Sequence, residues 1–140
     1  MRGLFRGKRV DNDEWVIGNL RYNLNAPQIL STANGVAYDV VPSTVGEAVP
    51  GLFDKNGVNV FEGDVLRPFD NEIIIVSWID HYHTLGLTVY LTQTFKKRGK
   101  EVTKTYEGKA LFLDYDFNRY EVIGNIHDNP GILDQISITQ

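Results

Sequence analysis

The apolar residues of this chain occur in short runs that are interrupted every few positions by turn-forming residues. Thirteen glycines and five prolines are spread through the 140 residues. No window of twelve or more residues carries apolar positions at helical spacing without a Gly or Pro. Short β-branched and aromatic runs between turn signals are typical of strands. The sequence therefore predicts a mainly β fold with little helix.

The expected strands follow these apolar runs. They cover residues 4–9, 14–24, 36–41, 58–61, 64–68, 72–80, 82–91, 102–106, 110–113, 120–126 and 136–139. A single helical turn is expected near residues 129–133, because Asn129 can cap a helix and Pro130 suits its first position. The expected turns are Asp11-Asn12-Asp13, Asn56-Gly57, Glu62-Gly63-Asp64 and the exposed loop Lys97-Arg98-Gly99-Lys100.

Short strands joined by tight turns are how small antiparallel barrels are built. We therefore expect a small barrel-like (SH3-like) antiparallel core with an additional N-terminal β-rich portion. A length of 140 residues fits one domain. Two lobes, residues 1–45 and 50–140, are the alternative division, although nothing between them has the composition of a linker.

Composition excludes several classes of protein. The chain has no cysteine, which excludes disulfides, thiolate zinc sites and a thiol nucleophile. The basic N-terminus is not followed by an apolar segment, so it does not have the pattern of a signal peptide. The longest apolar run, Ile73–Val76, is far shorter than the roughly 20 residues of a membrane helix. We expect a cytoplasmic protein with no membrane partner.

The charge is unevenly distributed. The net charge is −4, from 14 basic and 18 acidic residues, yet residues 1–10 and 96–109 each carry +4. Basic side chains beside aromatic residues could clamp phosphates and stack bases. The candidate nucleic-acid-binding residues are Arg6, Lys8, Arg9, Lys96, Lys97, Arg98 and Lys100. The alternative is a solubilising loop whose lysines protect a strand edge from aggregation.

Metal-binding or catalytic patterns are weak in this sequence. His81 and His83 flank Tyr82, and on a strand two such imidazoles would leave the same face, which makes a metal site conceivable. The simpler interpretation is a polar turn between two strands. No phosphate-binding loop and no Gly-x-Ser-x-Gly nucleophile motif occurs. We therefore name no catalytic residue and expect no cofactor.

Three segments, taken in order, carry a resemblance to a known family. They are Phe5–Gly18, the middle portion with Ser43–Glu47, Gly51–Gly57 and Val60–Leu66, and Tyr120–Pro130. Together they resemble the YopX family of phage and prophage proteins. The chain departs from the family pattern at Val49-Pro50, which intrudes before Gly51. The resemblance implies a small phage-encoded, mainly β protein in a bacterial host cell, and it implies no activity.

Three classes of function remain open at this point. The first is a self-associating structural or interaction protein, a homo-oligomer or the partner of a phage or host protein, since edge strands can pair between copies. The second is a small nucleic-acid-binding module acting through the basic loop. The third, ranked last, is a metal-assisted enzyme using His81 and His83.

Overall fold

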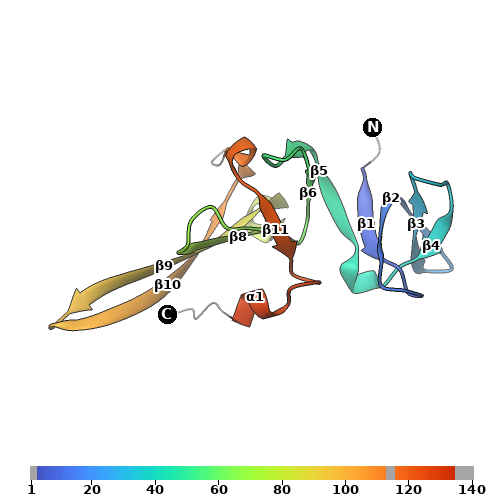
Figure 1. Ribbon diagram of the computed structural model, residues 1–140. Helices are drawn as coiled ribbons and strands as arrows, with labels where there is room; N and C mark the ends of the chain where they lie inside the picture. The colour runs from blue at the N-terminus through green and yellow to red at the C-terminus, as the bar shows by residue number, and fades with distance from the viewer. Residues whose placement is uncertain (1–2, 113–115, 135–140) are drawn as a thin grey trace. The chain divides into compact units, whose positions relative to one another are not determined.

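The computed structural model describes residues 3–112 and 116–134 (Figure 1). The chain forms two compact units, residues 1–52 and 53–140, each with strands of its own. The boundary falls within β5, slightly after the division between lobes considered from the sequence. The mainly β class is confirmed, and the neighbouring strands pair antiparallel.

The first unit is built on hairpins. Its elements are β1 (Phe5–Lys8), β2 (Trp15–Asn23), β3 (Ala26–Ser31), β4 (Ala37–Asp39), the 3-10 turn η1 (Pro42–Thr44) and most of β5 (Gly46–Phe53). The predicted hairpin turn at Asp11–Asp13 joins β1 to β2, closed by the hydrogen bond from Arg9 N–H to Glu14 O at 2.9 Å. The strands of this unit pair in the order β4-β3-β2-β1-β5.

A small apolar cluster holds the first unit together. Val16, Ile29 and Val40 are buried, and the partly buried residues packed against them are Phe5, Leu20, Tyr38 and Val45. Gly18 is required by the close approach of β2 to β3, because an added Cβ would fall on the carbonyl oxygen of Leu30.

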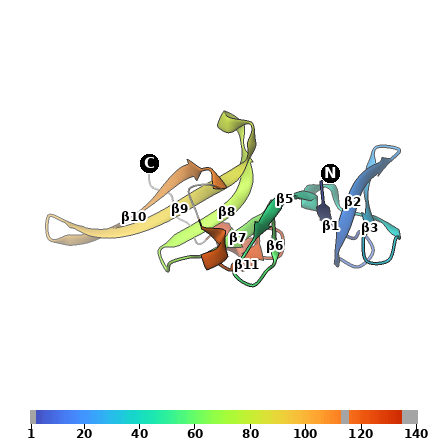
Figure 2. The same cartoon turned by 90° about the horizontal axis from the view of Figure 1, so that it is seen from above.

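The second unit contains a five-stranded sheet of order β10-β9-β8-β7-β11 (Figures 1 and 2). Its elements are β6 (Asn59–Phe61), β7 (Asp64–Leu66), β8 (Glu72–Ile79), η2 (Asp80–Tyr82), β9 (Thr84–Lys97), β10 (Lys100–Ala110), η4 (Phe117–Arg119), β11 (Val122–Asn125) and α1 (Gly131–Asp134). Ile73 through Val76 of β8 are all buried, so both faces of the sheet are covered along this strand. On one face, Val65, Ile73 and Ile75 pack with Tyr90, Ile126 and Ile132.

The carboxylate of Asp54 ties two distant segments of the second unit together. Its Oδ1 accepts hydrogen bonds from the N–H groups of Asn56 and Val58, both at 2.9 Å, which closes the predicted Asn56-Gly57 turn. Its Oδ2 accepts the N–H of Val122 at the start of β11, at 3.0 Å. Burial alone would raise the pKa of Asp54, but these N–H donors outweigh it and the pKa lies below its ordinary value.

A second link joins the Glu62-Gly63-Asp64 turn to the same late segment. Gly63 has φ +92°, and its carbonyl accepts the N–H of Ile126 at 2.9 Å. Beyond it, the side chain of Asn125 accepts the N–H groups of His127 and Asp128. The parts of the middle segment around Asp54 and Gly63 therefore meet the late segment in a framework of turns.

Two strands were missed from the sequence, β3 and β5, and each contains a proline. Pro27 is the second residue of β3, and Pro50 lies outside the two β5 residues that are in register with β1. A proline normally argues against a strand because it has no N–H to donate, but these positions tolerate it. The predicted strands 102–106 and 110–113 are wrong as separate strands, because β10 runs through to Ala110. The strand predicted at 136–139 lies outside the described residues.

The sheets are open, which corrects the barrel-like expectation. In the described ranges, 3–112 and 116–134, neither strand order closes on itself. The strands β9 and β10, at 14 and 11 residues, are longer than the 8-residue β8, so their distal parts leave the sheet as a ribbon. Across the same residues, no helix has the length and apolar character needed to cross a lipid bilayer.

Candidate functional site: a basic β-ribbon

The most distinctive surface of the second unit is the ribbon made by the distal parts of β9 and β10, residues 91–106, hereafter the arm. Figure 1 shows it in yellow and orange, extending away from the sheet. The pairing of β9 with β8 ends at Leu91, opposite Glu72. Beyond that point β9 and β10 pair with each other in unbroken register, from Leu91–Tyr106 to Lys97–Lys100. Most side chains of the arm are exposed.

The tip of the arm is a two-residue turn. Arg98 and Gly99 both adopt left-handed backbone angles, with φ +54° and +78°. Positive φ at both central residues is the geometry of the hairpin turns that match the twist of the flanking strands. The predicted loop is thus a tight turn, which brings Lys97 and Lys100 directly opposite each other.

The register divides the side chains of the arm between two faces. Successive residues of a strand point to opposite sides, and residues directly opposite each other share a side. One side, hereafter the basic face, carries Leu91, Gln93, Phe95, Lys97, Lys100, Val102, Lys104 and Tyr106. The other side, hereafter the threonine face, carries Thr92, Thr94, Lys96, Glu101, Thr103 and Thr105.

The polar side chains of the threonine face have partners on the same face. The hydroxyls of Thr92 and Thr105 hydrogen bond at 2.9 Å, and those of Thr94 and Thr103 at 3.0 Å. Lys96 lies opposite Glu101, so its charge is balanced across the strands. This face stabilises the ribbon and offers little net charge.

The basic face concentrates charge of one sign. The whole arm has five basic side chains and one acidic side chain, Glu101, which gives it a net charge of +4. Three of the five basic side chains lie on the basic face, and no acidic side chain does. Lys97, Lys100 and Lys104 share the basic face with Phe95 and Tyr106, which are 36% and 46% exposed. The amine of Lys104 lies 5.7 Å from the centroid of the Phe95 ring. Cations and aromatic rings are therefore interleaved on one side of an exposed ribbon.

The structure distributes the predicted basic residues differently from the sequence-based picture of one loop. Lys97 and Lys100 share a face, Lys96 leaves the opposite face, and Arg98 occupies the turn. Lys104 and Tyr106 complete the basic face; Lys104 was not among the predicted residues. Counting alternate positions back from the turn would have found it, because the side-chain period of a strand is two.

The N-terminal basic residues belong to the first unit and already have partners there. Arg6 and Lys8 lie over the Trp15 ring, at 4.7 and 5.5 Å from its centroid. Arg9 stacks on Tyr38 at 4.0 Å and binds the Asp11 carboxylate through two hydrogen bonds of 2.9 and 2.6 Å. The bond with Asp11 raises the pKa of Arg9 and lowers that of Asp11.

The two histidines do not lie on a strand, so the alternation argument for a shared metal face was wrong. His81 belongs to η2, with its ring edge-on to Tyr82 at 5.0 Å between centroids. His83 ends that turn with φ +52°. The segment is a turn between β8 and β9. Within the part of the chain that the structure describes, no group of three or more His, Asp or Glu side chains could hold a metal ion.

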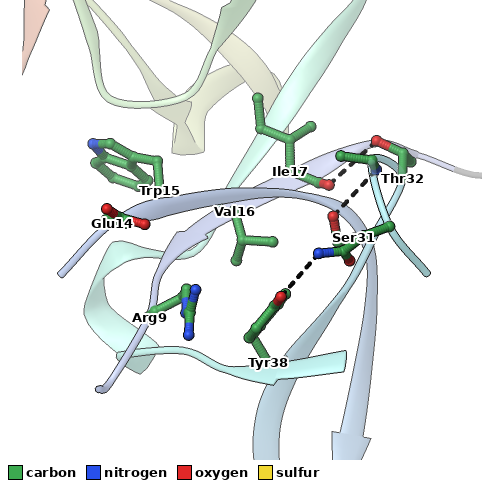
Figure 3. Close-up of a pocket in the computed structure, with 10 residues that line it drawn as sticks. Arg9, Glu14, Trp15, Val16, Ile17, Ser31, Thr32 and Tyr38 are labelled. Atoms are coloured by element: carbon green, nitrogen blue, oxygen red, sulfur yellow. Dashed lines mark hydrogen bonds between the residues drawn. The ribbon is translucent and has the colours of Figure 1, made fainter. Parts of the chain in front are cut away.

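The first unit also has an open cleft of about 410 Å³ (Figure 3). Its lining residues are Arg9, Glu14, Trp15, Val16, Ile17, Ser31, Thr32, Ala33, Asn34 and Tyr38. The Tyr38 hydroxyl accepts a hydrogen bond from the Asn34 amide at 2.9 Å, and the Thr32 N–H donates to Ile17 O at 3.1 Å. The polar groups of the cleft are largely engaged in hydrogen bonds within the first unit, which makes the cleft a weaker candidate than the arm.

Comparison with known proteins identifies the family. The family described as YopX protein matches residues 5–134, nearly the whole chain. The protein therefore belongs to the YopX family, as its sequence motifs indicated. No curated protein matches the chain at a significant level. Of the segments that carry the resemblance, the first forms the β1–β2 hairpin, Ser43–Glu47 covers η1 and the start of β5, and the others contain the framework around Asp54 and Gly63. The arm lies between the middle and late segments in the sequence.

Proposed function

We propose that this YopX-family protein is a phage- or prophage-encoded binding protein that holds nucleic acid through the basic face of the arm. The observation that carries the proposal is the sorting of charge between the two faces. Lys97, Lys100 and Lys104 share one face, while Lys96 and Glu101 offset each other on the opposite face. Phosphate contacts by lysines supply most of the affinity of sequence-independent nucleic-acid binding.

The net charge of −4 does not oppose this proposal, because contact is made by a projecting element with its own net charge of +4. An acidic body with a basic arm would be oriented by a polyanion so that the arm approaches first. The proposal implies a protein that acts in the cytoplasm of a bacterial host. It assigns the protein a binding role rather than an enzymatic one.

The direct test uses the full chain and labelled single- and double-stranded DNA and RNA at low and moderate salt. We expect micromolar binding that weakens steeply with salt and is lost in the Lys97→Glu/Lys100→Glu variant. The matched control, Lys96→Glu, changes the neighbouring residue on the threonine face and should reduce binding much less. Absence of binding at low salt, where electrostatic contact is strongest, would refute the proposal.

Self-association is a second candidate function, supported by a separate observation in the first unit. Leu24, in the turn between β2 and β3, is 94% exposed and has φ +50°, a backbone angle that disfavours a leucine. Tyr22 beside it is 67% exposed. A backbone angle this unfavourable for leucine motivates a functional hypothesis, and an exposed apolar pair offers a contact point for a second copy. We propose a second copy of the chain as the partner, and sedimentation at increasing protein concentration tests it.

A further inference from the structure

The basic face of the arm is arranged in rows, and their order points to one class of nucleic acid. Each row is a pair of residues directly opposite each other on β9 and β10. From the tip inward, the rows are Lys97–Lys100, Phe95–Val102, Gln93–Lys104 and Leu91–Tyr106. Successive rows on one face lie two residues apart, about 6.6 Å along the strands. Cationic rows therefore alternate with rows that contain an aromatic ring.

The aromatic rings in these rows are not part of an apolar core. Phe95 and Tyr106 are both exposed, and the contact found for Phe95 is the Lys104 amine at 5.7 Å. An exposed cation–π contact is weak and exchangeable. A base can therefore replace the amine on the ring of Phe95 and leave the lysine to meet a phosphate.

We infer that the arm binds single-stranded nucleic acid, with unpaired bases stacked on Phe95 and Tyr106 and phosphates held by Lys97, Lys100 and Lys104. This inference rests on the proposed nucleic-acid function and deepens it. Stacking on aromatic side chains between cationic groups is how proteins hold single strands without reading their sequence, because every base has a π-face.

Duplex DNA is the main competing ligand, since a two-stranded ribbon also fits its major groove. A ribbon in that groove reads base edges with polar side chains. On the basic face, Gln93 is the one amide, and the rings of Phe95 and Tyr106 would meet base edges rather than base faces. The threonine hydroxyls on the other face are bonded to one another. The arm is thus better matched to bases that are already unstacked.

The experiment measures binding of the full chain to four labelled polymers at low salt: oligothymidylate, an abasic strand of equal length, a duplex and polyglutamate. We expect the order thymidylate, then duplex and abasic strand, then polyglutamate. Phe95→Leu and Tyr106→Leu, which keep an apolar side chain, should each weaken thymidylate binding roughly tenfold. Neither should change binding to the abasic strand. Tyr82→Leu, an exposed tyrosine off the arm, is the matched control and should have no effect.

The outcomes separate the two levels of the proposal. Duplex binding as tight as thymidylate binding, or thymidylate binding unchanged in Phe95→Leu and Tyr106→Leu, would overturn the single-strand inference while leaving nucleic-acid binding in place. Equal binding of thymidylate and abasic strand by the unaltered protein would overturn it without any variant. Binding of polyglutamate alone, or of no polymer, would overturn the proposed function itself.

Discussion

Lys97 and Lys100 lie directly opposite each other across the tip of the β9–β10 ribbon, on the same face and closing the same turn. Like charges in directly opposed positions destabilise a strand pair. The neighbouring pair, Lys96 and Glu101, has the opposite-charge arrangement that stabilises one. The repulsion between the two lysines therefore lies at the tip of the arm, where a bound phosphate would neutralise it.

The first prediction separates stability from binding at this pair. Lys97→Glu should stabilise the tip by up to about 1 kcal/mol at low salt, because it converts repulsion into attraction. The same change should weaken nucleic-acid binding. Amide hydrogen exchange of Phe95 and Val102 reports the local opening of the arm. Faster exchange in Lys97→Glu would show that the lysine pair stabilises the ribbon instead.

A second prediction concerns the carboxylate that links the Asn56-Gly57 turn to β11. Asp54→Ala removes the acceptor of three backbone N–H groups and leaves them without this partner in a buried site. The free energy of unfolding should fall by about 3 kcal/mol. Denaturation in urea measures the change. A loss below that of an ordinary exposed substitution, about 0.5 kcal/mol, would contradict the role assigned to Asp54.

The same residue predicts how the second unit responds to acid. The pKa of Asp54 is lower in the folded chain than in the unfolded one, so its charge stabilises the fold at neutral pH. This contribution is complete above the unfolded pKa of about 3.9 and is lost as pH falls through the folded pKa. The difference in unfolding free energy between the unaltered protein and Asp54→Asn should therefore shrink as the pH is lowered.

Glu72 provides the control for the acid response. Burial raises the pKa of Glu72, so protonation of this residue favours the folded state, the opposite sign to Asp54. Glu72→Gln should leave the acid-induced loss of stability in place. A stability difference for Asp54→Asn that stays constant from neutral to acid pH would exclude Asp54 as the source.

Leu24 supports a further prediction in which stability and association change in opposite directions. Leu24→Asn places a residue that tolerates positive φ at φ +50°, so the β2–β3 turn should gain about 1 kcal/mol. The exposed apolar side chain is lost, so any concentration-dependent association should weaken. Thermal unfolding and sedimentation velocity measure the two effects. A variant that is more stable yet associates as before would exclude Leu24 as a contact between copies.

The sequence was most informative where one local signal decides the structure. The turns at Asp11–Asp13, Asn56-Gly57 and Arg98-Gly99 all form, because positive φ or an Asx side chain is a local preference. The strands β3 and β5 were missed because they contain Pro27 and Pro50, and a proline argues locally against a strand. Whether the strands close into a barrel depends on pairing between distant strands, which local patterns do not encode.

The candidate site was only partly predictable, for the same reason. The basic loop was apparent from composition, but grouping Lys97 of β9 with Lys100 and Lys104 of β10 on one face requires the register of the two strands. Placing Lys104 beside Phe95 and Tyr106 requires knowledge of the full length of both strands. The apolar pattern underestimates that length, because both faces of the ribbon are exposed. The assumption that His81 and His83 lie on a strand was wrong, because residues 80–82 form a 3-10 turn that ends at His83.

The role of the basic face is decided by the salt dependence of single-strand binding for the unaltered chain, Lys97→Ala and Lys96→Ala. These variants remove one positive charge each, from adjacent residues on opposite faces of the arm. We predict that Lys97→Ala reduces the slope of log affinity against log salt by about 0.7, the value for one phosphate contact on a single strand. Lys96→Ala should leave the slope nearly unchanged. Equal slopes for the two variants would contradict the claim that one face of the arm is the binding surface.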